Sequence, residues 1–480
     1  MEDNLFVSLL KTLNRRELAR FAELVGSPFF NKQPDCLAYI TLLQTNYPDF
    51  DLQPTHIFSK VYPDIKTFKF AKIHHLNSKM VQLLTIFFSQ LSLEANPAEQ
   101  TQLLLTQLSQ RQHEKQFWRV WQQANLAFEN DEILDAQQLK YCSTLQNSAN
   151  HWQSQTKGHQ TANHLQAQSK YFDAYYLATQ LATACEMKNR EAVLNIQFDL
   201  PLATHFLPLV SQHPQLYLQN MEVKLWYNLL MCLQHEDDPL YFNQLLEELT
   251  LLQDKAPAET AKAVYVHVQN YCIRKINAGL PDFLPQIMLI YRTQLQREWL
   301  FDALGFLSEW HYKNIVTVGL RLNEHQFIRN FIETYRAKLP PSVAYNAYNF
   351  NLATWYYFTK QHRQAMNLLL QVTFTDPVYQ LDARALLLKI YFESEETDAF
   401  FALCDSFKIF LTRHKTLSKR QQEGYSNLLR FARRAFTLRN KKDYIKKMTW
   451  QTELEQLRQQ IVKTTPIANL SWLNQQVNEL

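Results

Sequence analysis

LATWYYFTKQHRQAMNLLLQVTFTDP, residues 352–377, decides the fold of this 480-residue chain, because its pattern of residue types recurs 34 residues later. Matching types pair Leu352 with Leu386, Ala353 with Leu387, Tyr356 with Ile390, Ala365 with Ala399, and Leu369 with Leu403. This spacing indicates two closely packed antiparallel helices, which Pro377 closes. A 34-residue period of this kind is typical of a tetratricopeptide-like repeat, which binds partners along its surface and rarely carries out chemistry.

A weaker copy precedes this repeat. Ile328, Ile332 and Pro340 lie 37 residues before Ala365, Leu369 and Pro377, so a connection in the earlier copy is longer. Together the copies predict helical repeats from Lys313 to Thr412. Breaks from Met221 onward recur at Asp238-Pro239, Ala256-Pro257, Gly279-Leu280-Pro281 and Leu339-Pro340-Pro341, as expected for a solenoid of helix pairs.

Glycine is the most informative residue type in the composition, since the chain contains only 6 in 480 residues. Tight β-turns and phosphate-binding loops need positive φ, which glycine adopts most easily. The apolar fraction of 46% still provides enough side chains for a substantial core. We therefore expect an all-α protein: an extended right-handed tetratricopeptide-like solenoid preceded by an N-terminal helical domain.

Four regions are expected along the chain. They are an N-terminal helical domain (1–95), a glutamine-rich helical region (96–220), the repeat solenoid (221–440) and basic or capping helices at the C-terminus (441–480). The polar stretch from Ser143 to Lys170, with Gly158 at its centre, is either the turn of a helical hairpin or a flexible connector.

Helix ends can be placed within the N-terminal region. One helix is predicted from Asn14 to Leu24, with Gly26 ending it in the left-handed conformation and Ser27-Pro28 preventing its continuation. Phe29 and Phe30 are then expected to pack under the next helix. A longer helix with an apolar stripe is predicted from Thr67 to Leu93.

Several segments resemble a known family. They are Ser27-Pro28-Phe29-Phe30-Asn31, Lys313-Asn314-Ile315-Val316, Asn349-Phe350-Asn351-Leu352-Ala353, Asp376-Pro377-Val378-Tyr379, Leu381-Asp382-Ala383-Arg384 and Ser406-Phe407-Lys408. The chain is similar in them to a family of uncharacterised bacterial cytoplasmic proteins that are helical throughout, with tetratricopeptide-like repeats in the C-terminal half. The resemblance implies this architecture and implies no activity.

Motifs for catalysis and cofactor binding are missing from the sequence. Neighbouring glycines are never closer than 14 residues, which excludes the GxGxxG, Walker and GxSxG loops. The 15 histidines do not form HExxH or ExxH motifs, so His74-His75 and the group of His151, His159 and His164 are interpreted as solvated or core residues. The acidic clusters at residues 236–238 and 393–398 are interpreted as charges at helix ends. We expect no enzyme and no catalytic, cofactor or metal site.

The expected location is the cytoplasm. The chain begins with acidic residues and shows no secretory signal, and its most apolar segment, Met80 to Leu93, is too short and too polar to span a bilayer. Six scattered cysteines without a CxxC pair are typical of small buried residues in a reducing compartment. We expect no membrane insertion.

Charge is concentrated in one segment. Residues 408–447 contain 13 Lys and Arg against Glu423 and Asp443, a balance of +11 in a chain whose net charge is +4. A helix from Arg420 to Arg439 is predicted there, with an apolar face and a basic one. The basic candidates are Arg430, Arg433, Arg434, Lys441 and Lys442. They either bind nucleic acid or an acidic partner, or form the polar outer face of a capping helix.

A second candidate site lies in the repeats. The resemblance to tetratricopeptide repeats implies that the first helix of each pair faces a concave groove at Phe350, Thr354, Tyr357 and Phe358, and at Arg384, Leu388, Tyr391 and Phe392. The Lys and Asn that form the carboxylate clamp of tetratricopeptide repeats are missing from the first two of these positions. The preferred hypothesis is a non-enzymatic scaffold that holds a protein partner in this groove. One alternative is that these aromatic side chains pack against neighbouring helices. Another is that the basic segment, residues 408–447, binds a partner.

Overall fold

The computed structural model describes residues 4–129, 134–157, 163–194, 196–236, 238–252, 258–372, 376–414 and 417–480. These residues form 24 α-helices and one 3₁₀ helix, with no strand among them. The described chain is therefore all-α, which confirms the class predicted from the scarcity of glycine. Gly158, His159, Asp237, Ala256 and Pro257 lie outside the described residues.

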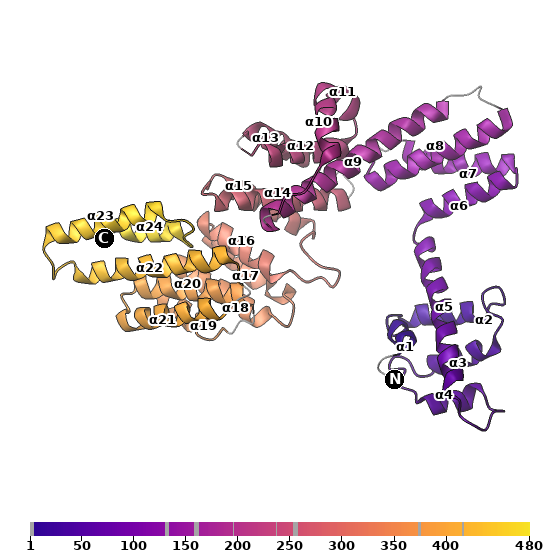
Figure 1. Ribbon diagram of the computed structural model, residues 1–480, viewed down its shortest axis with the longest axis horizontal. Helices are drawn as coiled ribbons and strands as arrows, with labels where there is room; N and C mark the ends of the chain where they lie inside the picture. The colour runs from indigo at the N-terminus through magenta and orange to yellow at the C-terminus, as the bar shows by residue number, and fades with distance from the viewer. Residues whose placement is uncertain are drawn as a thin grey trace. The chain divides into compact units, whose positions relative to one another are not determined.

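The helices follow one another in chain order with short connections (Figure 1). The first twelve are α1 (Leu5–Leu10), α2 (Arg15–Gly26), α3 (Pro34–Gln44), α4 (Pro54–Val61), α5 (Phe70–Glu94), α6 (Pro97–Gln110), α7 (Glu114–Glu129), α8 (Ala136–Lys157), α9 (Asn163–Leu194), α10 (Pro201–Gln212), α11 (Pro214–Tyr217) and α12 (Met221–Gln234). The others are α13 (Pro239–Leu252), α14 (Ala258–Asn277), α15 (Phe283–Gln296), α16 (Glu309–Arg321), α17 (His325–Tyr335), η1 (Arg336–Lys338), α18 (Ala344–Phe358), α19 (His362–Leu369), α20 (Pro377–Glu393), α21 (Thr397–Arg413), α22 (Lys419–Lys441), α23 (Lys447–Lys463) and α24 (Leu470–Asn478).

The chain divides into two compact units. The first contains the described residues within 1–184 and 198–230, and the second those within 185–197, 231–253 and 258–480. In the first unit, α1 to α5 enclose one apolar core that runs from Phe6 to Phe87. The boundaries expected at residues 95, 220 and 440 are not tested by this division and stay predictions.

Helix α2 ends close to the predicted residue, but for a different reason from the one predicted. The helix runs to Gly26, and this glycine keeps a negative φ, so no left-handed residue ends it. Ser27 ends the helix in an extended conformation with ψ 123°, because proline at the next position disfavours the helical conformation. The following Phe29 is 88% exposed, so the expectation that it packs under the next helix is wrong. The amide of Asn31 instead closes the turn by donating to the carbonyl oxygens of Val25 and Gln33.

Helices α6 to α9 supply a small aromatic core in the first unit. The ring of Phe117 stacks on Trp152 with centroids 4.5 Å apart, and His164 contacts the rings of Trp118 and Trp121. Burial lowers the pKa of His164, whose Nδ1 lies 2.7 Å from the side-chain oxygen of Gln146. This histidine is a packed residue, as expected. Residues 143–157 and 163–170 of the polar stretch are helical, in α8 and α9, so it is not a flexible connector over most of its length; the turn between them falls outside the described residues.

In the second unit one turn geometry joins several helix pairs. The chain leaves α16, α18 and α20 through a residue with positive φ: Asn323 (60°), Lys360 (60°) and Glu395 (58°). In each case the next N–H donates back to a carbonyl five residues earlier, as Gln361 does to Tyr356 at 2.8 Å. This is the hydrogen bond of a Schellman motif, which satisfies carbonyls that a helix end leaves free. The three turns are 37 and 35 residues apart.

These turns relate the two helix pairs in a different register from the one predicted for a repeat. The two pairs α18–α19 and α20–α21 are related by 35 residues rather than 34, because Lys360 and Glu395 occupy the same turn position. Burial follows this register. Ala353 and Leu388 are both 0% exposed, and Ala365 and Phe400 are as well. The sequence match of 34 residues was one residue out because both pairs carry apolar residues at adjacent positions. The 37-residue spacing of the earlier copy agrees with the turns.

The described residues also show where the cysteines lie and how apolar the helices are. All six cysteines are buried, and burial raises the thiol pKa of Cys232, Cys272 and Cys404 to about 12. None of the described helices is both long enough and apolar enough to cross a membrane.

Candidate functional site

The candidate groove positions of α18 lie mostly in the core. Phe350, Thr354 and Tyr357 are at most 8% exposed, and Phe358 is half-buried. The rings of Phe350 and Tyr379 are in edge contact at 5.5 Å, and Tyr357 belongs to the same apolar cluster as Leu386 and Ile390 of α20. Contrary to the expectation of an open groove, Phe350 and Tyr357 pack against α20, and the Thr354 hydroxyl donates to the carbonyl of Phe350 in its own helix.

The candidate positions of α20 show the same packing. Leu388 and Phe392 are 0% and 1% exposed, within a core shared with α21, α22 and α24. Arg384 is half-buried and its guanidinium lies 4.8 Å from the ring centroid of Phe410 on α21. Tyr391 is half-buried against the same core. The packing alternative that the sequence left open therefore accounts for Leu388 and Phe392, and the structure does not bring the eight positions together on one open surface.

The C-terminal helix α24 covers part of this region. Trp472 is 8% exposed and its ring meets Phe392 edge-on at 5.3 Å. Its indole N–H donates to Glu393 at 2.9 Å, and the hydroxyl of Tyr357 donates to the same carboxylate oxygen. We call this contact of α24 with α18 and α20 the covered face. Because Trp472 lies in the last eleven residues, no local sequence signal connected it with the repeat.

Charged side chains of α20 also contact neighbouring helices of the second unit. The carboxylate of Asp382 accepts from Lys313 at 2.6 Å and from the Tyr425 hydroxyl at 3.0 Å. Burial lowers the pKa of Lys389 to about 8, and the nearby carboxylates of Asp382 and Glu393 offset only part of that effect. Glu393, interpreted from the sequence as a charge at a helix end, is the last residue of α20, and its side chain is 10% exposed. Asp382 joins α20 to Lys313 of α16 and Tyr425 of α22, and Glu393 joins it to Tyr357 and Trp472, so both carboxylates connect neighbouring helices.

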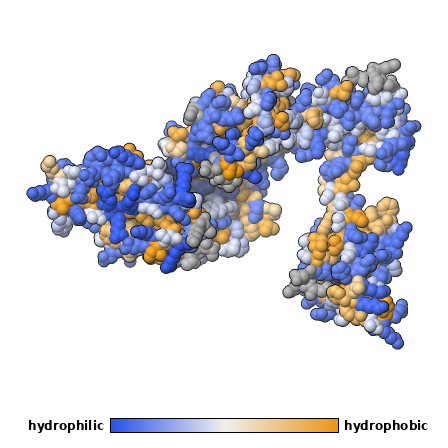
Figure 2. Space-filling view, viewed as in Figure 1, coloured by the Kyte–Doolittle hydropathy of each residue, from blue (hydrophilic) through white to orange (hydrophobic). Residues whose placement is uncertain are grey.

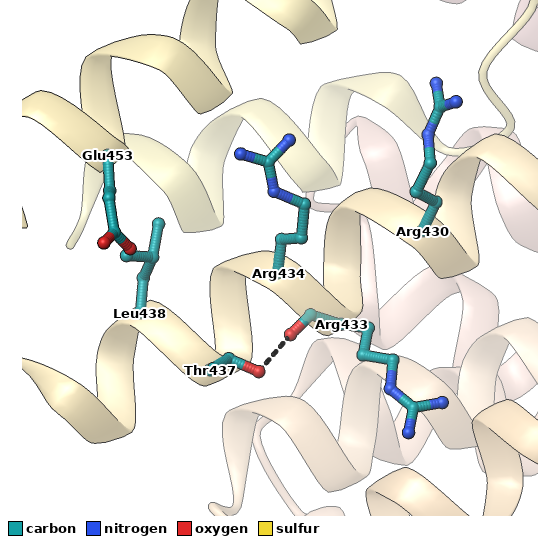
Figure 3. A pocket seen from close by; sticks show the side chains of 6 residues that line it. All are labelled: Arg430, Arg433, Arg434, Thr437, Leu438 and Glu453. Atoms are coloured by element: carbon teal, nitrogen blue, oxygen red, sulfur yellow. Dashed lines mark hydrogen bonds between the residues drawn. The ribbon is translucent and has the colours of Figure 1, made fainter.

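The basic residues of α22 lie differently. A capping box of Ser418 and Gln421 begins this helix, and its apolar side packs on α21, α23 and α24. Arg430 and Arg433 are exposed, and Arg434 is half-buried. Figure 3 shows Arg430 and Arg434 extending to one side of α22 and Arg433 to the other. We call the side of α22 that carries Arg430 and Arg434 the arginine face.

A hollow of about 400 Å³ lies at the arginine face. Its lining residues are Arg430, Arg433, Arg434, Thr437, Leu438 and Glu453. The first five come from α22 and Glu453 from α23; Arg433 borders the hollow, but its guanidinium extends to the other side of α22. Residues four apart on a helix lie about 5–6 Å from one another at Cβ, so Arg430 and Arg434 present two neighbouring guanidinium groups. Arg434 is positioned by a hydrogen bond that it donates to the side-chain oxygen of Gln460 on α23.

Acidic side chains form ion pairs with some of the basic side chains of residues 408–447 and not with others. Arg433 pairs with Asp405 at 2.6 Å and Arg439 with Glu395 at 2.7 Å. Arg430 has no acidic partner within ion-pair distance among the residues that the structure describes. Its guanidinium lies 4.4 Å from the ring centroid of Phe431. Lys441 and Lys442 are exposed at the end of α22, where Lys442 donates to a carbonyl oxygen of Leu480 at 2.6 Å.

The arginine face is the candidate functional site, because guanidinium groups that face an open hollow can bind an anion. The described residues include no group of three or more His, Cys, Asp or Glu side chains suited to a metal. No protein-family model, curated protein or solved structure matches this chain. The family resemblance drawn from the sequence therefore stays a prediction.

Proposed function

We propose that this chain is a non-enzymatic interaction protein that binds an acidic segment of a protein partner at the arginine face. The observation that carries the proposal is the pair Arg430 and Arg434, which extend together over the hollow between α22 and α23. The covered face is filled by the chain's own helices, so it supports this role less well than the arginine face does.

The chemistry of arginine favours carboxylates. A guanidinium group presents parallel N–H donors that match the two oxygens of one carboxylate, and it stays charged at any physiological pH. Two such groups one helical turn apart suit two acidic side chains of an extended or helical segment. Thr437 and Leu438 line the hollow beside them, so a hydroxyl and an apolar contact are both available to that segment.

The neighbouring acids favour a protein over nucleic acid. Glu453 lines the hollow itself, Asp405 of α21 lies beside Arg433, and Glu395, in the turn between α20 and α21, lies beside Arg439. Nucleic acid binding depends on phosphate charges along a continuous basic surface, and each of these carboxylates would repel a phosphate. A protein segment with mixed charge can place a donor opposite Glu453 and carboxylates opposite the arginines.

The helix pairs of the second unit hold the arginine face in a fixed position. We propose that α16 to α23 form a tetratricopeptide-like solenoid, and the recurring Schellman turns at Asn323, Lys360 and Glu395 support it. Such a repeat holds its helices at fixed spacing and so presents a preformed surface to a partner. A preformed surface loses less conformational entropy on binding than a mobile one.

Fluorescence anisotropy tests the proposal with two labelled probes, a glutamate-rich peptide and a single-stranded DNA oligonucleotide of equal charge. We expect the full-length chain to bind the peptide more tightly, and Arg430→Gln/Arg434→Gln to weaken that binding by about tenfold or more. Arg15→Gln/Arg16→Gln is the charge-matched control, since both arginines are exposed on α2. Tighter binding of the oligonucleotide, lost in the Arg430/Arg434 variant, would overturn the proposal in favour of nucleic acid.

A further inference from the structure

The connection between α22 and α23 differs from the arginine face in its chemistry. Lys441, Lys446 and Lys447 are exposed there, and Asp443 is the one acidic residue of the segment 441–448. Tyr444 and Met448 are 86% and 82% exposed within this basic segment. We call residues 441–448 the lysine tip. It lies at the free end of the α22–α23 hairpin (Figure 1).

The lysine tip is held in place from the inside. Ile445 packs against the core of the second unit, and Trp450 donates its indole N–H to the carbonyl of Leu438 at 3.0 Å. The backbone N–H of Tyr444 donates to the carbonyl of Lys441 at 2.9 Å. The exposure of Tyr444 and Met448 is thus a consequence of a fixed turn in which Ile445 faces inward. At this end of the molecule Figure 2 shows a hydrophilic surface interrupted by hydrophobic patches.

We propose that the lysine tip docks on an anionic phospholipid surface. Exposed lysines are attracted to the negative surface potential of such a membrane, and each adds a similar increment of binding. A tyrosine ring is apolar with a polar hydroxyl, which suits the headgroup level of a bilayer, and Met448 adds an apolar contact beside it. No helix has to cross the bilayer for this docking.

The choice of a lipid surface over an acidic protein follows from the residue types. Lysine is a compact charge on a flexible stem without the fixed fork of arginine, so it suits a diffuse layer of headgroups better than one oriented carboxylate. None of the three lysines forms an ion pair within the described chain, so their charges are available to the membrane. The arginine face, by contrast, uses guanidinium groups. The two surfaces use different residues, so either proposal can fail without the other.

Vesicle co-sedimentation of the full-length chain tests the docking. The probes are vesicles of phosphatidylcholine alone and of phosphatidylcholine with phosphatidylserine. We expect binding to the mixed vesicles only. Lys441→Gln/Lys446→Gln/Lys447→Gln should lower the partition coefficient by about a hundredfold, on the order of fivefold for each lysine. Tyr444→Ser/Met448→Ser should lower it by about tenfold at unchanged net charge.

Two controls make the result decisive. Lys11→Gln/Lys32→Gln/Lys66→Gln removes the same charge from exposed positions of the first unit and should leave sedimentation unchanged. The Arg430→Gln/Arg434→Gln variant should also retain more binding than the triple lysine variant of the tip. Equal binding to both vesicle types, or an equal loss in the tip variant and its Lys11/Lys32/Lys66 control, contradicts docking through the lysine tip. Binding of the tip to a glutamate-rich peptide but not to vesicles would assign it to a protein partner and overturn the proposal.

Discussion

The covered face and the arginine face lie on neighbouring helices of the second unit, and both were candidate binding surfaces in the sequence. On the covered face, Glu393 accepts hydrogen bonds from Tyr357 and Trp472 and is 10% exposed. On the arginine face, Arg430 is exposed with no acidic partner among the described residues. One surface has satisfied its polar groups internally, and the other has polar groups left for a ligand.

The two faces are therefore expected to have different roles: the covered face contributes to the stability of the fold, and the arginine face to binding. A buried charge that loses its partner destabilises the fold, whereas an exposed arginine can be changed at little cost to it. Variants of the covered face should therefore change the free energy of unfolding, and variants of the arginine face should change affinity. A variant that did the opposite would break the comparison.

Trp472→Ala should have the largest effect. The substitution removes the ring that contacts Phe392 and the donor to Glu393, so we expect the free energy of unfolding to fall by roughly 3 kcal/mol. Urea unfolding followed by circular dichroism measures this loss. Val462→Ala on α23 is the control, since Val462 is 86% exposed and should change little. Equal midpoints for Trp472→Ala and the wild type would show that α24 does not stabilise the covered face.

Lys389 should make stability depend on pH. Burial holds its pKa at about 8 in the folded chain, below the ordinary value of 10.5, so the unfolded chain binds more protons between these values. Stability from this group is therefore fully present above pH 10.5 and is lost as pH falls through about 8. Compared with Lys389→Met, the wild type should gain on the order of 2 kcal/mol between pH 8 and 10.5. The measurement is the difference between their urea midpoints across this range; a difference independent of pH contradicts the prediction.

Arg434→Gln should act on binding and not on folding. We expect about tenfold weaker binding of the glutamate-rich peptide in anisotropy titrations, because one of two charge-assisted contacts is lost. The urea midpoint should stay at the wild-type value. A large fall in that midpoint with unchanged affinity would place Arg434 among the stabilising residues instead.

Arg433→Gln should have the smallest effect. This guanidinium extends to the other side of α22 and already pairs with Asp405, so we expect less than a twofold change in peptide affinity. The same anisotropy titration compares it with Arg434→Gln. Losses of equal size in the two variants would show that net charge, rather than the arginine face, determines binding.

The sequence predicted the features that depend on neighbouring residues. The low glycine content predicted helices, and the basic and apolar faces of α22 followed from helical spacing. The 34-residue match was one residue out because apolar residues stand side by side in α18 and α20, and only the turns at Lys360 and Glu395 fix the register. Contacts between distant segments left no such signal. Trp472 meets Glu393 across 79 residues, so the burial of that carboxylate could not be inferred.

Charge reversal tests the central claim most directly. The measurement is the affinity of Arg430→Glu/Arg434→Glu for a glutamate-rich peptide and for a lysine-rich peptide of the same length, with Arg15→Glu/Arg16→Glu as the control. If the arginine face binds acidic segments, the variant loses the first peptide and gains the second, while the control keeps the wild-type preference. If the variant and the control have the same affinity for both peptides, the arginine face is not the binding site.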